Sequence, residues 1–327
     1  MIWLAPGLEA ENRFILGPMA GVTDAAFRTV CMEQGAGLCY TEMVSAKALT
    51  YRDKKTASLL ALTPKQRPVI AQIFGSEPDV MAEGARLALE ISGADGLDIN
   101  MGCPMPKITG NGEGSALMLD PARASRVIEA VRKAVNVPLS VKFRAGWDEG
   151  HKNAVEFARM AQQSGADFVC VHGRTRSQFY SGQSDRSVVT AVKAAVTVPV
   201  IASGDAFSPQ GCQDILRDTG ADAVMIARGA QGAPWIFAQC LAFADGRPSH
   251  PVTAEEHIGL MRRHVRLVCE MKGEARGMPE IRKHALWYLG RLRGGKPFKV
   301  QMAQVATLRQ FEEICDGLLQ ARLQVKA

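Results

Sequence analysis

The stretch Ser164-Gly165-Ala166-Asp167-Phe168-Val169-Cys170-Val171-His172 joins the end of a predicted helix to a glycine, a short apolar strand and a polar residue. Glycine is common where a helix ends, because it adopts the left-handed conformation at little cost. The same kind of phrase recurs at Ser92-Gly93-Ala94-Asp95 and at Thr219-Gly220-Ala221-Asp222, each followed directly by another apolar run. This repetition predicts alternating helices and strands, and therefore parallel pairing of the strands.

Eight such apolar segments alternate with helical stretches over the first 230 residues. Eight βα units in this length predict an α/β fold of the (β/α)₈ TIM-barrel type. A doubly wound open sheet is the alternative, but no Gly-x-Gly-x-x-Gly turn follows the first strand. The expected strands are 14–20, 38–43, 68–74, 96–100, 138–143, 168–172, 199–203 and 223–227, and the expected helices are 25–34, 79–92, 121–135, 153–164, 187–195 and 209–219.

The last quarter of the chain has a different pattern, with helices alone. Thr253 followed by Glu256 forms a capping box, which predicts the start of a helix. We therefore expect a barrel domain of residues 1–240 and a small all-helical domain of residues 250–327. The expected helices of this tail are 253–271, 279–289 and 300–323.

The formal charge of +6 is concentrated in this tail. Residues 1–250 contain 25 Lys plus Arg and 25 Asp plus Glu, whereas residues 251–327 contain 14 and 8. A basic module attached to a neutral domain indicates a polyanionic partner, although a solvated helical surface gives a similar charge. The sequence contains no apolar run near the roughly 18 residues of a membrane span and no signal-peptide pattern at its start. We therefore expect a cytoplasmic protein without a membrane partner.

The eight cysteines include no Cys-x-x-Cys pair, so we expect reduced thiols and no metal site. Seven of them are set among residues typical of a helix or strand core. Cys103 instead follows the fourth predicted strand in a loop, where a barrel places its active site. This position favours a catalytic role for Cys103 over an incidental one. The glycine-rich segment 109–115 that follows is a candidate lid.

Four neighbouring strands each end with a polar residue between apolar ones. Side chains alternate along a strand, so the apolar neighbours face one way and the polar residue faces the other. A single polar residue of this kind is usually a satisfied core group, but four at equivalent places favour a functional site. These residues are Gln72, Asn100, Lys142 and His172.

The seventh and eighth predicted strands are followed by Ser203-Gly204-Asp205 and Ala227-Arg228-Gly229. TIM barrels commonly hold a phosphate at this place. Glycine lets backbone amides approach phosphate oxygens, and arginine binds them with two hydrogen bonds. The two segments together predict a phosphate-binding end of the site.

Four longer motifs closely resemble those of the tRNA-dihydrouridine synthases, most nearly the bacterial B type. The resemblance covers about residues 14–237, and the helical tail has the expected kind and length. The motifs are Pro18-Met19-Ala20-Gly21-Val22-Thr23-Asp24 with Phe27-Arg28, Asp98-Ile99-Asn100-Met101-Gly102-Cys103-Pro104, Gly114-Ser115-Ala116-Leu117-Met118 and His172-Gly173-Arg174-Thr175-Arg176.

The resemblance implies a flavoenzyme that holds flavin mononucleotide (FMN) and uses NADPH or NADH to reduce the 5,6 double bond of particular uridines in the D-loop region of tRNA. It implies that Lys142 lies by flavin N1 and O2, where a fixed cation makes the ring easier to reduce. It also implies that Gln72 bonds the pyrimidine edge of the flavin. The cofactor-binding residues implied by the resemblance are Pro18, Met19, Ala20, Gln72, Lys142, His172, Ser203, Gly204, Asp205, Ala227 and Arg228.

The implied reaction transfers a hydride from flavin N5 to uracil C6, and Cys103 gives a proton to C5. An ordinary thiol is mostly protonated at neutral pH, so this role is chemically sound. The resemblance places Asn100 and Arg176 at the target uracil, and Arg174 near the mouth. Two positions depart from the pattern: Ser203 and Ala227 replace the Asn and Gly of several relatives. Flavin binding tolerates Ala227 if its φ angle is ordinary.

The resemblance gives the basic tail an expected ligand, the tRNA substrate. Basic side chains bind the phosphates of RNA without reading the RNA sequence. Its first predicted helix carries Arg262, Arg263 and Arg266 on adjoining parts of one face. A later loop carries further cations: Arg291, Arg293, Lys296 and Lys299.

Two other functions fit parts of the pattern: an FMN-dependent reductase of a free pyrimidine or other small molecule, and an RNA-binding protein with a scaffold barrel. The basic tail favours tRNA as the partner over the first. Cys103, Lys142 and His172 favour an enzyme over the second. We expect no stable protein partner, and the oligomeric state is left open, with a monomer allowed.

Overall fold

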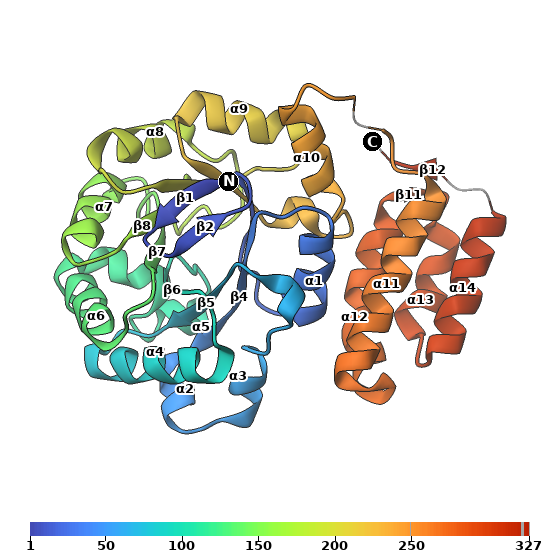
Figure 1. Ribbon diagram of the computed structural model, residues 1–327, viewed down its shortest axis with the longest axis horizontal. Coiled ribbons are helices and arrows are strands. Elements are labelled where there is room, and N and C mark those ends of the chain that lie inside the picture. Colours follow the sequence, from blue (N-terminus) through green and yellow to red (C-terminus); the bar gives the residue numbers. More distant parts are fainter. Residues whose placement is uncertain (249, 322–323, 327) are drawn as a thin grey trace.

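The computed structural model describes residues 1–248, 250–321 and 324–326. Eight parallel strands close into a barrel in the order β10-β3-β4-β5-β6-β7-β8-β9, so the predicted TIM barrel is confirmed and the open sheet is wrong (Figure 1). The strands are β3 (Phe14–Leu16), β4 (Leu38–Ser45), β5 (Val69–Phe74), β6 (Gly96–Met101), β7 (Leu139–Arg144), β8 (Phe168–His172), β9 (Val200–Ser203) and β10 (Ala223–Ile226).

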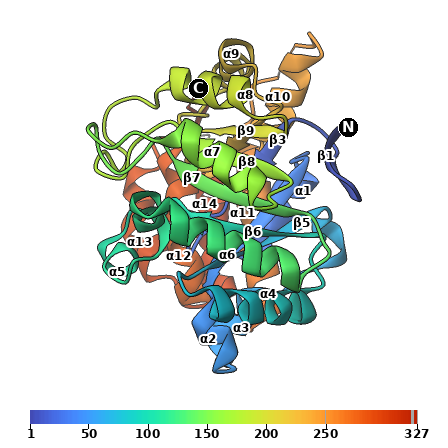
Figure 2. The same ribbon diagram turned by 90° about the vertical axis from the view of Figure 1, so that its left-hand side faces the viewer.

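The helices between these strands cover the outside of the barrel, and Figure 2 shows α6, α7 and α8 on the side turned away from the tail. Gly93 and Gly220 end α4 and α9 with φ angles of 60° and 65°, as the repeated phrase predicts. The helices of the barrel are α1 (Ala25–Glu33), α2 (Ala46–Thr50), α3 (Lys54–Ser58), α4 (Pro78–Ser92), α5 (Pro106–Thr109), α6 (Pro121–Ala134), α7 (Ala154–Gln163), α8 (Arg186–Ala195), α9 (Pro209–Thr219) and α10 (Ile236–Ala244).

Along the barrel strands, the side chains that pack against the helices alternate with the side chains that face the barrel interior. In β6, Leu97 and Ile99 pack outward into the hydrophobic cluster formed with the surrounding helices. Asp98 and Asn100 lie on the other face, inside the barrel, where Asn100 pairs in register with Lys142 of β7. The barrel interior therefore carries polar side chains toward the carboxyl ends of the strands.

An N-terminal hairpin, β1 (Ile2–Ala5) and β2 (Leu8–Ala10), was not predicted. Its residues Leu4 and Leu8 pack in one cluster with Ile15, Phe168 and Met225, which are inward residues of the barrel strands. The hairpin thus closes the amino-terminal end of the barrel (Figure 1). The first barrel strand is also shorter than predicted: it ends at Leu16, and residues 17–20 leave the sheet as a loop.

The tail forms a helical bundle beside α1 (Figure 1). The Thr253 capping box is confirmed. The second helix begins at Glu274, so Pro279 lies inside it and not at its start, because Gly273 with a φ of 75° has already ended the helix before. The expected third helix is two helices, since Thr307 caps a new one, and its predicted end at Leu323 lies outside the described residues. The tail elements are α11 (Ala254–Lys272), α12 (Glu274–Gly290), β11 (Leu292–Arg293), α13 (Lys299–Gln304), α14 (Leu308–Gln320) and β12 (Gln324–Val325).

The tail docks on the barrel through aromatic and ionic contacts with α1 and the residue that precedes it. The ring of Phe27 stacks on His264 at 5.3 Å between centroids and lies 5.4 Å from that of His284. Lys272 forms an ion pair of 2.8 Å with Asp24, the N-cap of α1.

No helix in the described parts of the chain is both long and apolar enough to cross a membrane.

Candidate active site

A cavity of about 530 Å³ opens at the carboxyl ends of the barrel strands. This volume is in the range of small-molecule and cofactor sites. The cavity brings together Cys103 and most of the residues that the sequence predicts for the site, whereas Arg174 and Arg176 are not part of its lining. The predicted residues in the lining are Pro18, Met19, Ala20, Gln72, Asn100, Cys103, Lys142, His172, Ser203, Gly204, Asp205, Ala227 and Arg228.

One side of the cavity is cationic. Among the described residues, the ammonium group of Lys142 has no hydrogen-bond or ion-pair partner, so it is free to bind an anion or an oxygen ligand. Arg144 is 4% exposed, and its Nε donates to the carbonyl oxygen of Gly102 at 2.7 Å. Burial lowers the pKa of Arg144 to about 10, which still leaves it charged at neutral pH.

His172 is neutral in this cationic environment. Burial and the nearby charges of Lys142, Arg144, Arg174 and Arg228 hold its pKa well below the ordinary value. The Nδ1 atom of His172 accepts a hydrogen bond of 3.2 Å from the backbone amide of Arg174. In the neutral ring the proton therefore resides on Nε2, which makes His172 a hydrogen-bond donor.

The predicted phosphate end is built on tight backbone packing. Gly204 has a φ of 122°, and a Cβ atom at this position would lie 2.2 Å from Ser184 Oγ. Asp205 has a φ of 55°, a left-handed conformation that is uncommon outside glycine. Ala227 has a negative φ of −118°, so this position does not adopt the left-handed conformation that favours glycine.

Arg174 lies beneath this loop and not at the mouth. Its side chain is 2% exposed and forms an ion pair of 2.8 Å with Asp205. It also donates to the carbonyl oxygens of Ser181 and Gly182. These contacts correct the expected placement of Arg174 near the mouth, because its guanidinium is committed to holding the Asp205 loop.

The loop of Cys103 is held from two sides. The Oδ1 atom of Asn100 accepts hydrogen bonds from the amides of Gly102 and Cys103, at 3.1 Å and 2.9 Å. The amide and hydroxyl groups of Ser115 donate to the carbonyl oxygen of Cys103 at 3.1 Å and 2.9 Å. Gly114 packs behind Cys103, so this end of the expected lid supports the cysteine loop.

All eight cysteines are free thiols, and Cys103 differs from the other seven because those seven are buried. It lines the cavity with part of its surface exposed. Burial raises the pKa of its thiol, and this effect outweighs the opposite influence of Arg144 and Lys142. Cys103 is therefore a protonated thiol at neutral pH, which is the form a general acid requires.

Arg176 lies in the loop that follows β8, where its guanidinium is 4.5 Å from the centroid of the Trp147 ring. The side chain is half-buried, and its Nε has no hydrogen-bond partner among the described residues. Arg176 is outside the cavity lining, so the structure neither brings it to Cys103 nor commits its charge to an acid.

The three tail arginines do not form an unpaired basic stripe, which corrects the sequence-based expectation. Arg262 and Arg266 both pair with Glu312 of α14, at 2.6 Å and 2.7 Å. Arg263 points to the barrel and pairs with Glu33 of α1 at 2.9 Å. Their charges hold the bundle together and to the barrel.

Sequence reasoning missed several residues of the site. Arg144 follows Lys142 by two positions in β7, so strand alternation would have placed it on the same inward face. Tyr180 and Phe207 line the cavity, and the guanidinium of Arg228 lies 4.5 Å and 5.2 Å from their ring centroids. No local pattern marks these two aromatic residues, because they lie in irregular loops.

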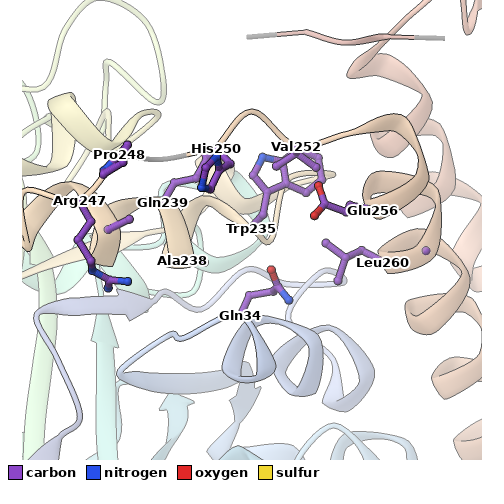
Figure 3. A pocket seen from close by; sticks show the side chains of 12 residues that line it. Gln34, Trp235, Ala238, Gln239, Arg247, Pro248, His250, Val252, Glu256 and Leu260 are labelled. Carbon is purple, nitrogen blue, oxygen red and sulfur yellow. The ribbon is translucent and has the colours of Figure 1, made fainter. Parts of the chain in front are cut away.

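A second cavity, of about 710 Å³, lies where α10 and the following linker meet α11 (Figure 3). Trp235, Val252 and Leu260 give it apolar walls, with Arg247 and Glu256 at its edges. Arg247 is paired with Asp245 at 2.7 Å. This cavity is larger than the one at the barrel mouth but contains none of the predicted site residues, so volume alone does not identify the active site.

Comparison with known proteins identifies the family. The family model described as dihydrouridine synthase (Dus) matches residues 15–324. The chain belongs to the dihydrouridine synthase family. It is similar to tRNA-dihydrouridine synthase B of Pseudomonas aeruginosa, with 39% identity over 310 residues that cover 92% of each chain. It is also similar to a probable tRNA-dihydrouridine synthase of Rhizobium leguminosarum, with 43% identity over 284 residues and 87% of each chain covered.

Dihydrouridine synthases are flavin-dependent oxidoreductases, so the expectation of an enzyme is confirmed. The solved histamine dehydrogenase from Rhizobium sp. 4-9 has a similar fold, with a TM-score of 0.59 at 13% identity. The alignment covers 81% of this chain and 50% of that one, so this chain spans half the length of the dehydrogenase.

The cavity fits a flavin with a phosphate tail. Lys142 offers an ammonium group with no acid partner among the described residues, and neutral His172 offers an N–H donor. Arg228 adds a guanidinium whose only acidic neighbour in the described part is Asp205 at 3.7 Å. A dianionic phosphate matches such a set of donors and cations, whereas a cationic ligand does not.

Proposed function

We propose that this protein is a tRNA-dihydrouridine synthase that uses FMN and NADPH, or NADH, to reduce the 5,6 double bond of specific uridines in the D-loop region of tRNA. The observation that carries this proposal is the shared cavity: a protonated, partly exposed Cys103 and a Lys142 with no acid partner in the described part of the chain line the same mouth of the barrel. Family membership supports the reaction class. We place the activity in the cytoplasm because the proposed substrate is tRNA.

The barrel residues would hold the cofactor along the cavity. Pro18, Met19 and Ala20, which leave the first barrel strand as a loop, would form one edge of its ring site. Lys142 would compensate negative charge on the ring, and Gln72 would hydrogen-bond its polar edge. When bound, FMN supplies the hydride, taken from NADPH, to C6 of the uracil. The phosphate would be held by His172, Ser203, Gly204, Ala227 and Arg228, with Asp205 positioning the loop.

The protein residues supply the proton and orient the substrate. Cys103 donates its thiol proton to C5 of the uracil, since its raised pKa keeps it protonated at neutral pH. Asn100 holds the backbone of Cys103 in place and has one amide hydrogen left for the substrate. Arg176, in the loop after β8, would hold the RNA strand, and Arg174 would act only through the Asp205 loop.

The helical tail, residues 250–327, would bind the tRNA while the barrel, residues 1–240, carries the chemistry. Arg291, Arg293, Lys296 and Lys299 have no acid partner among the described residues. These four cations suit phosphate contacts better than Arg262, Arg263 and Arg266, which are paired within the protein. The target uridine must leave its stack to reach Cys103, as is general for enzymes that act on bases.

The proposal is tested with the purified protein and a tRNA that lacks dihydrouridine. Expected results are a bound flavin with its visible absorbance, NADPH or NADH oxidation that depends on tRNA, and dihydrouridine in the recovered RNA. Equal activity on free uridine or uracil would instead indicate a small-molecule reductase. tRNA binding without any turnover would indicate an RNA-binding scaffold.

A further inference from the structure

A buried carboxylate lies beneath the active-site cavity. Asp98, in the middle of β6, is fully buried inside the barrel. Its Oδ1 accepts a hydrogen bond of 2.5 Å from the hydroxyl of Ser140, and its Oδ2 accepts one of 2.7 Å from Nε2 of Gln72. Both partners are its direct neighbours on β7 and β5. Asp98 is not part of the cavity lining, so it has no contact with a ligand there.

The hydrogen bonds continue from Asp98 to the cysteine loop. The Oε1 atom of Gln72 accepts from Nδ2 of Asn100 at 3.0 Å. The Oδ1 atom of Asn100 then accepts from the backbone amide of Cys103 at 2.9 Å. Three side chains thus connect the barrel interior to the residue that supplies the proton.

The two ends of this chain fix the direction of every bond in it. Backbone amides only donate, so Asn100 must turn its oxygen to Cys103 and its nitrogen to Gln72. Gln72 must then turn its oxygen to Asn100 and its nitrogen to residue 98, which has to be an acceptor. The Oδ2 atom of Asp98 meets this need whether the carboxyl group is ionised or carries a proton on the oxygen that faces Ser140.

Packing alone does not account for a carboxyl group at this place. Elsewhere in the barrel interior the inward residues include Ile70 on β5 and Phe168 and Cys170 on β8, which are apolar. Burial raises the pKa of Asp98 to about 7, so ionisation of this carboxyl group costs free energy at its place in the barrel. A leucine would occupy a similar volume without this cost but would leave Gln72 Nε2 without an acceptor.

We infer that Asp98 is a positioning residue: it is the fixed acceptor that orients Gln72 and Asn100, and through them it holds Cys103 in its place at the cavity. This inference rests on the proposed function in so far as Cys103 is taken as the proton donor. It assigns no direct contact with substrate or cofactor to Asp98.

The experiment compares two substitutions at one position. Asp98→Leu keeps the branched shape and removes the acceptor. Asp98→Asn keeps an acceptor for Gln72, because its amide nitrogen can donate to the Ser140 hydroxyl. Asp95→Leu is the matched control for general destabilisation: Asp95 accepts from the Val69 amide at 2.9 Å and lies just before β6, at the opposite end of the barrel from Cys103.

The first readout needs neither cofactor nor tRNA: the rate of alkylation of Cys103 by iodoacetamide at fixed pH, located by peptide mass analysis. Release of the Cys103 loop exposes the thiol and lowers its pKa toward the ordinary value, so the thiolate fraction rises. We expect alkylation to become about fivefold to tenfold faster in Asp98→Leu, because both the accessibility and the thiolate fraction of Cys103 increase. Asp98→Asn is expected to stay within about threefold of the wild type, and Asp95→Leu to match it even if its melting temperature falls.

The second readout is turnover on tRNA. Misplacement of a reacting group by about 1 Å costs on the order of 10²-fold in rate. We expect this loss in kcat for Asp98→Leu, with KM for tRNA unchanged and most of the activity restored in Asp98→Asn. If Asp98→Leu does not fold, Asp98→Ala replaces it with the same expected outcome.

Two results would overturn the inference. One is Cys103 alkylation in Asp98→Leu or Asp98→Ala at the wild-type rate. The other is equal loss of turnover in Asp98→Leu and Asp98→Asn, which would mean that the charge matters and not the acceptor. Failure of the proposed function is measured separately, as a wild-type protein that forms no dihydrouridine. The alkylation rates of the variants can be compared in that case too, so the two failures are distinguishable.

Discussion

Arg174 and Asp205 form an ion pair beneath the proposed phosphate site, with 2.8 Å between Nη1 and Oδ1 and a hydrogen bond of 2.9 Å from Nη2 to Oδ2. The guanidinium is almost completely buried, whereas the side chain of Asp205 is 27% exposed. Arg174 also lowers the pKa of Asp205, against the opposing effect of burial. The pair fixes a loop whose backbone at Asp205 is left-handed.

Loss of the Arg174 charge should therefore weaken both the fold and cofactor binding. We expect Arg174→Met to lower the free energy of unfolding by about 3 kcal/mol, because it leaves a partly buried carboxylate without its partner. Flavin affinity should fall with it, since the loop is released. Arg176→Met is the control, and its free energy of unfolding should change by less than about 1 kcal/mol. Urea denaturation measures both, and equal effects of the two substitutions would contradict the assignment.

Replacement of Cys103 separates chemistry from binding. Cys103→Ala should retain flavin and tRNA affinity, because no side chain among the residues that the structure describes forms a hydrogen bond with the thiol. Turnover should fall by about 10²- to 10⁴-fold, the usual contribution of a general acid. Single-turnover assays of dihydrouridine formation measure the loss. Cys212→Ala is the control for loss of a thiol, since Cys212 is buried in α9. Full activity of Cys103→Ala would show that the proton comes from another source.

The basic loop of the tail should carry the salt-dependent part of tRNA binding. Changing Arg291, Arg293, Lys296 and Lys299 together to Gln should weaken binding at low salt. It should also reduce the slope of log affinity against log salt by about 3, since each lost phosphate contact removes a little under one unit. The control is Arg266→Gln, whose partner is Glu312. A salt slope equal to that of the wild type in the fourfold variant would rule out this loop.

The docking of the tail should be sensitive to acid. Burial lowers the pKa of His264 from 6.5 to about 4, and that of His257 likewise to about 4. Between these values the unfolded chain binds more protons than the folded one, so the free energy of unfolding falls as pH decreases below 6.5. Each such histidine contributes about 1.4 kcal/mol per pH unit in this window.

The variant His264→Phe tests this pH dependence. Phenylalanine keeps an aromatic ring beside Phe27 but binds no proton, so the slope of stability against pH should decrease by about one proton between pH 6 and pH 4.5. Urea denaturation at several pH values gives the slope. An unchanged slope would mean that His264 does not titrate on unfolding, in spite of its burial.

Local sequence patterns predicted the order of helices and strands in the barrel. Gly93 and Gly220 mark helix ends because the left-handed conformation is a property of one residue and its neighbours. Alternation placed Gln72, Asn100 and Lys142 on the inner face for the same reason. The N-terminal hairpin escaped because strands as short as Leu8–Ala10 give no clear period.

Ion pairs between residues far apart in the sequence could not be predicted from local patterns. Arg262 and Arg266 are separated from Glu312 by about one-seventh of the chain, so only the packing of α11 on α14 shows that their charges are neutralised. Arg174 and Arg176 are two residues apart in one motif, yet one is buried against Asp205 and the other lies over Trp147. The tertiary structure determines which role each arginine has, and no local sequence pattern distinguishes the two roles.

The central claim is that this chain reduces uridines in tRNA and that Cys103 gives the proton. The most direct measurement maps dihydrouridine at nucleotide resolution in tRNA from cells that lack the protein, and from the same cells supplied with the wild type or with Cys103→Ala. We predict that dihydrouridine is lost at one or a few D-loop positions, is restored by the wild type, and is not restored by Cys103→Ala. Unchanged dihydrouridine at every tRNA position in cells without the protein would contradict the claim.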